Sequence, residues 1–286
     1  MEANELFKIR SVTSCMKEAY RMETKELKAL IKKTWWAMLA CAFLCALTLY
    51  FRTPNKALHD WGEGSPTVAF ITQTAIYGLC FLSTFLPGTA VWKWITGKKW
   101  GSTLATYSVL RLLNILVAMV FAVLFTYVFR ATVTGWALGT ACALVGFVLC
   151  LPFAYVIPHF LLHDRKERKT LWKAWSCGLM NLGRLFLLGF LSYLILFVLE
   201  CIVAIPGIIL MGAQLLSQIG ALEGDPTGVP GYFTPLFIGV LTILFFVTLY
   251  LTTWIDLAYM FLNTSITTEE KDKANNTYTL LNNEKD

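Results

Sequence analysis

Long apolar blocks separated by short polar connections dominate the hydropathy pattern of this 286-residue chain. Each block holds roughly 18 to 28 residues, and 18 helical residues rise about 27 Å, enough to cross the hydrocarbon core of a bilayer. The blocks cover residues 34–51, 67–86, 104–129, 135–162, 185–210 and 235–262. The pattern therefore predicts an all-α fold, a polytopic membrane helix bundle with six transmembrane helices.

Prolines interrupt several of these blocks. The second span is expected to stop at Pro87, and Pro152 and Pro158 both fall inside the fourth. Because proline lacks an amide hydrogen and clashes with the preceding helical turn, the fourth span is expected to be kinked.

The regions flanking the spans differ in their periodicity. Residues 1–33 place Leu6, Ile9, Met16 and Tyr20 at helical spacing among charged residues, which predicts a cytoplasmic amphipathic helix. Such a helix either lies on the inner membrane surface or docks against a partner helix. Residues 263–286 are polar and show no apolar period, so a disordered cytoplasmic tail is expected.

The basic residues indicate the orientation of the spans. Of the 24 Lys and Arg residues, all but Arg52, Lys56 and Arg130 fall on one side of the predicted membrane. By the positive-inside rule, both termini are expected in the cytoplasm. The basic connections after spans two and four, residues 91–102 and 163–184, also carry tryptophans, and we call them the elbows.

Composition narrows the class of protein further. The chain is 57% hydrophobic and only 15% charged, whereas soluble domains carry about a quarter charged residues, so an ordinary soluble enzyme is excluded. The net charge of +6 reflects topology, and we expect no nucleic-acid partner. The sequence contains no phosphate-binding loop, zinc-protease motif or hydrolase nucleophile motif, so we expect no catalytic residue, cofactor or metal.

Three ionisable residues stand inside the apolar blocks, where a charge is costly. Arg111 and Asp256 both lie roughly 9 to 11 Å from the cytoplasmic ends of their spans, whereas Glu200 lies roughly 22 Å from that side. Arg111 and Asp256 can therefore meet, either as an ion pair joining two spans or as the charged floor of a path for substrate or protons. Glu200 is expected to be protonated, hydrogen-bonded or facing an outer cavity.

Histidines cluster at the cytoplasmic end of span four. His159 and His163 stand four residues apart, on one helix face, and are followed by Asp164. Two imidazoles and a carboxylate can hold a metal ion. With three histidines in the whole chain, an interfacial role for the three residues is favoured over a metal site.

The segment from Phe153 to Leu188 resembles the elbow of bacterial six-helix membrane proteins of unknown function, which are related to the membrane domain of some glycerophosphodiester phosphodiesterases. The residues that carry the resemblance are Tyr155, Pro158, Leu161, Asp164, Ala174, Trp175, Gly178 and the apolar run from Leu185. The phosphodiesterase catalytic domain has no counterpart in this chain. The resemblance implies a multi-pass protein of the bacterial inner membrane and no particular activity.

Three functional hypotheses follow from these observations. The first is a non-enzymatic scaffold or accessory subunit that binds membrane lipid or a partner protein through the cytoplasmic elbows. The second is a small transporter with a site around Arg111, Glu200 and Asp256. The third, a membrane enzyme acting on lipid, lacks an identifiable nucleophile.

Overall fold

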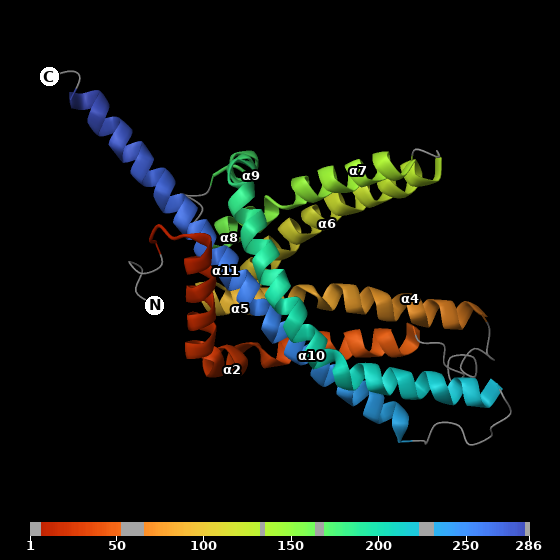
Figure 1. Ribbon diagram of the computed structural model, residues 1–286. Coiled ribbons are helices and arrows are strands. Elements are labelled where there is room, and N and C mark those ends of the chain that lie inside the picture. The colour runs from red at the N-terminus through yellow and green to blue at the C-terminus, as the bar shows by residue number, and fades with distance from the viewer. Residues whose placement is uncertain (1–6, 53–65, 132–134, 164–168, 223–231, 284–286) are drawn as a thin grey trace. The chain divides into compact units, whose positions relative to one another are not determined.

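The computed structural model describes residues 7–52, 66–131, 135–163, 169–222 and 232–283 (Figure 1). These residues are helical apart from short connections, which confirms the all-α fold class. The helices in chain order are α2 (Val12–Arg52), α4 (Pro66–Ser83), α5 (Phe85–Thr96), α6 (Trp100–Ala131), α7 (Gly135–Cys150), α8 (Phe153–Leu162), α9 (Leu171–Met180), α10 (Leu182–Leu222) and α11 (Phe233–Asn283).

Six helical stretches among the described residues are long and apolar enough to cross a membrane. They are Val12–Tyr50, Thr74–Thr96, Trp100–Thr126, Gly139–Leu162, Leu182–Val203 and Phe233–Lys273. Each one overlaps one of the six predicted spans, in the predicted order. The protein is therefore a multi-pass membrane protein.

The chain divides into two compact units. Unit 1 comprises Met1–Leu27, Thr96–Tyr193 and Trp254–Asp286. Unit 2 comprises Lys28–Ile95 and Leu194–Thr253. Helices α2, α10 and α11 each contribute to both.

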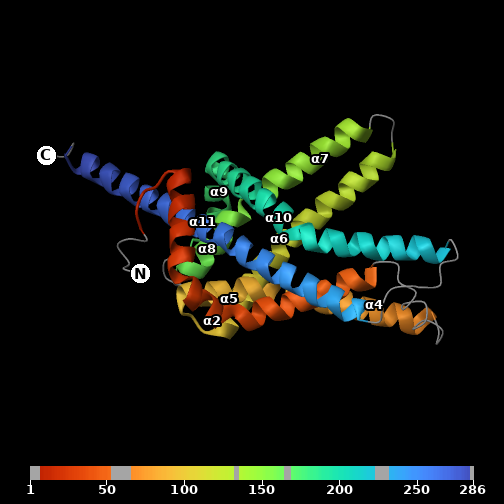
Figure 2. The same cartoon turned by 60° about the horizontal axis from the view of Figure 1, so that its bottom comes forward.

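Unit 1 contains a helical hairpin and a helical corner. Helices α6 and α7 lie side by side in both views (Figures 1 and 2). Gly146 of α7 allows this close approach, because a Cβ at that position would meet the ring of Phe121. The corner is formed by α8 and α9, where Gly178 lies against Pro152.

Unit 2 is held by two apolar clusters and one buried polar contact. The first cluster contains Leu30, Met38, Val91 and Tyr250, and the second contains Ala46, Phe237 and Leu241. The Thr34 hydroxyl lies 3.0 Å from the Tyr250 hydroxyl, so both hydroxyls are satisfied within the apolar surroundings.

Both predicted interruptions occur, the first before the expected proline and the second at one of the two expected prolines. Helix α4 ends at Ser83, and Pro87 lies in the first turn of α5, where its missing amide hydrogen costs nothing. In span four the break falls between Cys150 and Phe153, whereas Pro158 lies inside α8. The second span thus does not stop at Pro87, and the kink in the fourth is at Pro152.

The C-terminal region corrects the expectation of a disordered tail beginning at residue 263. Helix α11 continues to Asn283 without a break, and Asn263, Thr264, Ser265, Ile266 and Thr267 are buried. At 1.5 Å per residue its 51 residues rise about 77 Å, more than twice the hydrocarbon thickness. The polar end of α11, including Glu269 and Glu270, therefore lies outside the membrane.

Residues 12–33 are helical, as the amphipathic pattern predicts, but the helix does not end there. The location of this segment on the membrane surface stays a prediction. Helix α2 runs from Val12 to Arg52 through the expected boundary. Cys15 and Ala19 are fully buried, and the indole nitrogen of Trp254 donates to the carbonyl of Met16 at 3.2 Å. This part of α2 therefore packs against α11 within unit 1.

The contact between Gly178 and Pro152 predicts a strong effect of a single methyl group. In Gly178→Ala the new Cβ would lie 2.9 to 3.1 Å from Cβ, Cα and the carbonyl oxygen of Pro152, so backbone must move. We expect a loss of about 1–3 kcal/mol of stability, measured as a lower Tm in detergent. Gly183→Ala, whose Cβ would meet nothing within 4 Å, should be neutral or slightly stabilising; equal Tm values for the two variants would contradict the tight corner.

Candidate functional site

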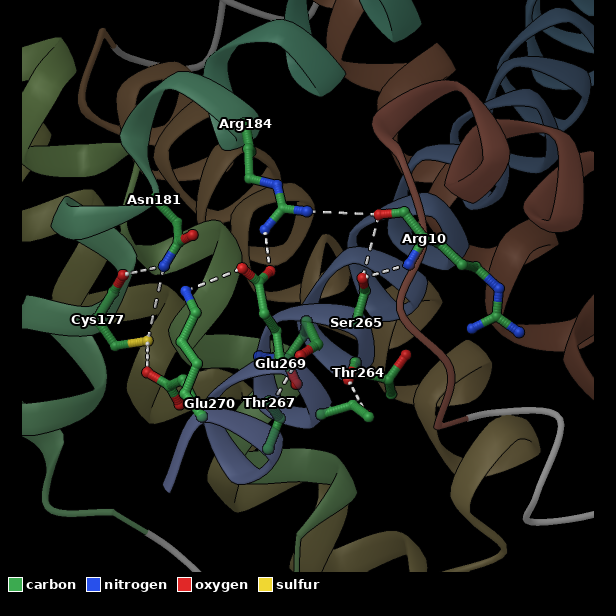
Figure 3. A network of polar contacts seen from close by, with 12 residues as sticks. Arg10, Cys177, Asn181, Arg184, Thr264, Ser265, Thr267, Glu269 and Glu270 are labelled. Carbon is green, nitrogen blue, oxygen red and sulfur yellow. Dashed lines mark hydrogen bonds and ion pairs between the residues drawn. The ribbon is translucent and has the colours of Figure 1, made fainter. Parts of the chain in front are cut away.

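A polar cluster surrounds residues 264–270 of α11 in unit 1 (Figure 3). It joins four segments of the chain: the residues before α2, residues 169–177 before and within α9, the first turn of α10, and residues 265–273 of α11. Two neighbouring carboxylates of α11, Glu269 and Glu270, are its acidic members.

Glu269 binds two cations from different helices. Arg184 of α10 places Nη1 2.7 Å from Oε2, and Lys273 of α11 places Nζ 3.0 Å from Oε1. The hydrogen bond from Arg184 is the main reason why the pKa of Glu269 is lowered, with a further contribution from Lys273. Glu269 is therefore ionised at neutral pH and ties α10 to α11.

Glu270 has a different set of partners. Lys169 forms an ion pair with Oε2, and the thiol of Cys177 donates to Oε1 at 3.0 Å. Burial, together with the hydrogen bond to Glu270, raises the pKa of Cys177 to about 11. The Cys177 thiol therefore stays protonated at neutral pH, and it acts as a hydrogen-bond donor rather than a nucleophile.

The N-terminal segment is fastened to the same cluster. The backbone amide of Arg10 donates to Oγ of Ser265 at 2.7 Å, and that hydroxyl donates to the Arg10 carbonyl at 3.2 Å. Arg184 reaches the same carbonyl at 3.5 Å, and the Arg10 guanidinium lies 5.1 Å from the centre of the Phe261 ring. Ser265 is fully buried, so these contacts are shielded from water.

The helical period of α11 explains why these side chains gather. Phe261, Ser265 and Glu269 are four residues apart and form one face, which receives Arg10 and Arg184. Asn263 and Glu270 lie on another face. The Asn263 amide donates to the Tyr155 carbonyl of α8 at 3.0 Å, and Glu270 receives the partners from the second elbow.

This polar face is what the sequence analysis missed. Residues 263–273 have no apolar period, and the sequence pattern therefore predicts disorder there. The one local signal is the run of mostly small polar residues, 263–268, that directly follows the last span. The partners of Ser265 and Asn263, however, lie more than 100 residues away and give no local signal.

The two predicted interfacial histidines are both buried. The rings of His159 and His163 have centroids 4.4 Å apart, and Nδ1 of His163 lies 3.1 Å from the His159 carbonyl. Lys98 donates to the carbonyls of Leu161 and His163 at 2.8 and 3.4 Å, which connects the first elbow to the end of α8. Asp164 lies outside the described residues.

Within the described part of the chain, no group of three or more His, Cys, Asp or Glu residues is arranged to hold a metal ion. His159 instead stacks on Tyr155, with ring centroids 5.6 Å apart, and Nε2 lies 3.4 Å from the amide of Lys169. The predicted interfacial role of the histidines remains a prediction.

The predicted intramembrane charges are distributed over both units. Arg111 of α6 and Asp256 of α11 belong to unit 1, and the Arg111 charge acts electrostatically on Asp256. Among the described side chains, no ion pair within 4.0 Å joins these two. Tyr107 and Tyr259 also interact with the Asp256 charge. Glu200 of α10 belongs to unit 2 and is half-buried.

Comparison of the chain with protein families, with curated proteins and with solved structures returned no match. The function must therefore be argued from the chain's own geometry.

The polar cluster predicts an acid-sensitive N-terminus. Because the folded pKa of Glu269 is lowered, its stabilisation is complete above the ordinary value of 4.5 and is lost as the pH falls through the folded pKa. An exposed ion pair contributes about 0.2–1 kcal/mol. Glu269 also holds Arg184, which reaches the Arg10 carbonyl at 3.5 Å. We therefore expect hydrogen exchange of residues 7–27, corrected for the intrinsic rate, to rise about two- to fivefold on acidification.

Variants separate this effect from general acid unfolding. In Glu269→Gln, residues 7–27 should already exchange faster at pH 7. Acidification should then add no further increase that depends on position 269. Arg21→Gln is the control, since its pairing with Glu18 is 3.9 Å long and confined to one exposed helical turn. Unchanged exchange in Glu269→Gln, or an equal effect in Arg21→Gln, would refute the fastening role of Glu269.

Proposed function

We propose that this protein is a non-enzymatic scaffold or accessory subunit of the bacterial inner membrane, which binds membrane lipid or a partner protein through its elbows. The observation that supports this proposal is the polar cluster around Glu269 and Glu270. Its carboxylates are neutralised by Arg184, Lys273 and Lys169, and its thiol donates to a carboxylate. These ion pairs join α10 and the residues before α9 to α11, and each described charge in the cluster has a partner within it.

The location of this end of the protein is part of the same proposal. The strong bias of Lys and Arg to one side supports cytoplasmic N- and C-termini, by the positive-inside rule. The elbow from Phe153 to Leu188 supports a bacterial inner-membrane protein through its resemblance. Together they favour a rigid cytoplasmic end that presents the second elbow to a binding partner.

The test is native mass spectrometry of the protein released from membranes of the cell that produces it. The scaffold proposal expects a defined lipid or protein mass bound to wild type. The same mass should be lost from Arg184→Gln, which disrupts the cluster, and retained by Asp256→Asn, which lies in the membrane. Arg184→Lys keeps the charge and is the control for folding. If wild type carries no defined mass, or if Arg184→Gln retains it, the proposal is wrong.

A small transporter is the second candidate, and the specific observation in its favour is the Asp256 environment. Asp256 is half-buried in an apolar helix, and it interacts electrostatically with Arg111, Tyr107 and Tyr259. An ionisable residue at this depth is costly and is retained for structure or for transport.

A double-mutant cycle decides between these roles of Asp256. If Arg111 and Asp256 are a structural pair, Asp256→Asn should lower the Tm, and adding Arg111→Gln should restore part of it, with a coupling energy of about 0.5–3 kcal/mol. A transport role instead predicts that both single variants keep the wild-type Tm but lose pH-dependent uptake in proteoliposomes. Additive Tm losses would contradict the structural pair.

A further inference from the structure

Helix α9 is amphipathic in the structure and lies on the surface of unit 1. Ala174, Cys177 and Gly178 are spaced by three or four residues and are buried. The opposite face is exposed: Trp172 is 73% exposed and Met180 is 86% exposed. Most of the apolar surface of these two large side chains is therefore left uncovered by the described residues.

The position of α9 along the chain determines what it meets. It connects Leu162, the end of one membrane-spanning helix, to Leu182, the start of the next. Both ends of this connection stand at the same membrane surface, and the single residue Asn181 separates α9 from the start of the next span, so α9 lies next to that surface. Lys98 supports this placement, since it joins the first elbow to the carbonyl of Leu161 at the end of the preceding span.

Aromatic and basic side chains share the exposed face of α9. The indoles of Trp172 and Trp175 stack with centroids 5.3 Å apart, and the Trp175 nitrogen donates to the Leu149 carbonyl at 3.4 Å. Trp175 thereby anchors the pair to α7 while Trp172 faces outward. Lys173, between them in sequence, is exposed, and among the described residues no carboxylate lies within 4.0 Å of it.

The charges near α9 favour a lipid with an anionic headgroup. Residues 169–184 and 263–273 hold five bases and three acids, and two of those acids, Glu269 and Glu270, are already ion-paired with Arg184, Lys273 and Lys169. The surface near α9 therefore carries excess positive charge. Tryptophan and methionine suit the boundary between headgroups and acyl chains, and lysine suits an anionic headgroup.

We infer that the exposed face of α9, formed by Trp172, Lys173 and Met180, inserts into the adjacent leaflet and binds anionic phospholipid, with Lys173 contacting the headgroup. This inference deepens the proposed function and rests on it, since it selects lipid rather than protein as the occupant of the second elbow. The leaflet then covers Trp172 and Met180, and the headgroup phosphate neutralises Lys173.

Site-specific photocross-linking of the full-length protein tests this directly. A benzophenone amino acid is placed at position 172, and the protein is reconstituted in nanodiscs holding equal parts phosphatidylglycerol and phosphatidylcholine. Mass spectrometry of the irradiated protein then gives the ratio of the two lipid adducts. One lysine near an anionic surface is worth about a fivefold preference, so we expect the phosphatidylglycerol adduct to be enriched about fivefold.

Matched variants identify the source of the preference. Lys173→Gln should abolish the enrichment, and Lys173→Arg should keep it. The same benzophenone at Met119, which is 62% exposed on the membrane-spanning part of α6, should give lipid adducts with no headgroup preference. Equal adducts at position 172, or enrichment that survives Lys173→Gln, would overturn the anionic-lipid assignment.

The remaining outcomes separate this inference from the scaffold proposal. The second arm of the photocross-linking experiment irradiates native membranes that contain the protein with the benzophenone at position 172. If position 172 there forms an adduct with a defined protein and none with lipid, the lipid inference fails and the scaffold proposal stands. If position 172 prefers phosphatidylglycerol but native mass spectrometry finds no mass that depends on Arg184, the lipid surface stands and the scaffold proposal fails.

Discussion

The hydrocarbon interior offers no hydrogen-bonding partner to the backbone, and this constraint shapes every membrane-spanning segment of the protein. A helix satisfies its amides and carbonyls internally, so the chain crosses the membrane in helices, and any interruption needs local compensation. At the break between α4 and α5, Ser83 and Thr84 donate to the carbonyls of Cys80 and Phe81, both at 2.7 Å. At the break before α8, the amide of Ala154 donates to the Leu151 carbonyl at 3.0 Å.

Outside the membrane the constraint is different, because water competes for every polar contact. In the polar cluster around Glu269 and Glu270, partial burial limits the access of water, and several side chains share the same partners. Arg184 binds both Glu269 and the Arg10 carbonyl, and Ser265 is donor and acceptor for one residue. Such linked contacts are worth more than isolated surface ion pairs, since a side chain already ordered by one contact loses less entropy in the next.

The sequence predicted those features that depend on local composition. Six apolar stretches gave six spans, because length and hydropathy are properties of each segment alone. The prolines predicted that the second and fourth spans are interrupted, but not the exact positions. Pro87 is tolerated within a first helical turn and Pro158 within α8. The cluster on α11 could not be predicted, because Ser265, Glu269 and Glu270 are distinguished from an ordinary polar tail only by partners contributed by other segments. Conversely, the predicted proximity of Arg111 and Asp256 rested on depth in the membrane, and the structure places both in unit 1 without a direct ion pair.

The fastening of Arg10 to Ser265 also constrains the order of events during biosynthesis. The two residues are 255 positions apart, and a ribosome adding about 5–20 residues per second needs about 13–50 s to traverse that distance. Throughout this interval the first residues of the nascent chain are without the partner they bind in the finished protein. Closure of unit 1 is therefore a post-insertion event, and a chain truncated before its last helix would leave the insertion machinery with its N-terminal segment undocked.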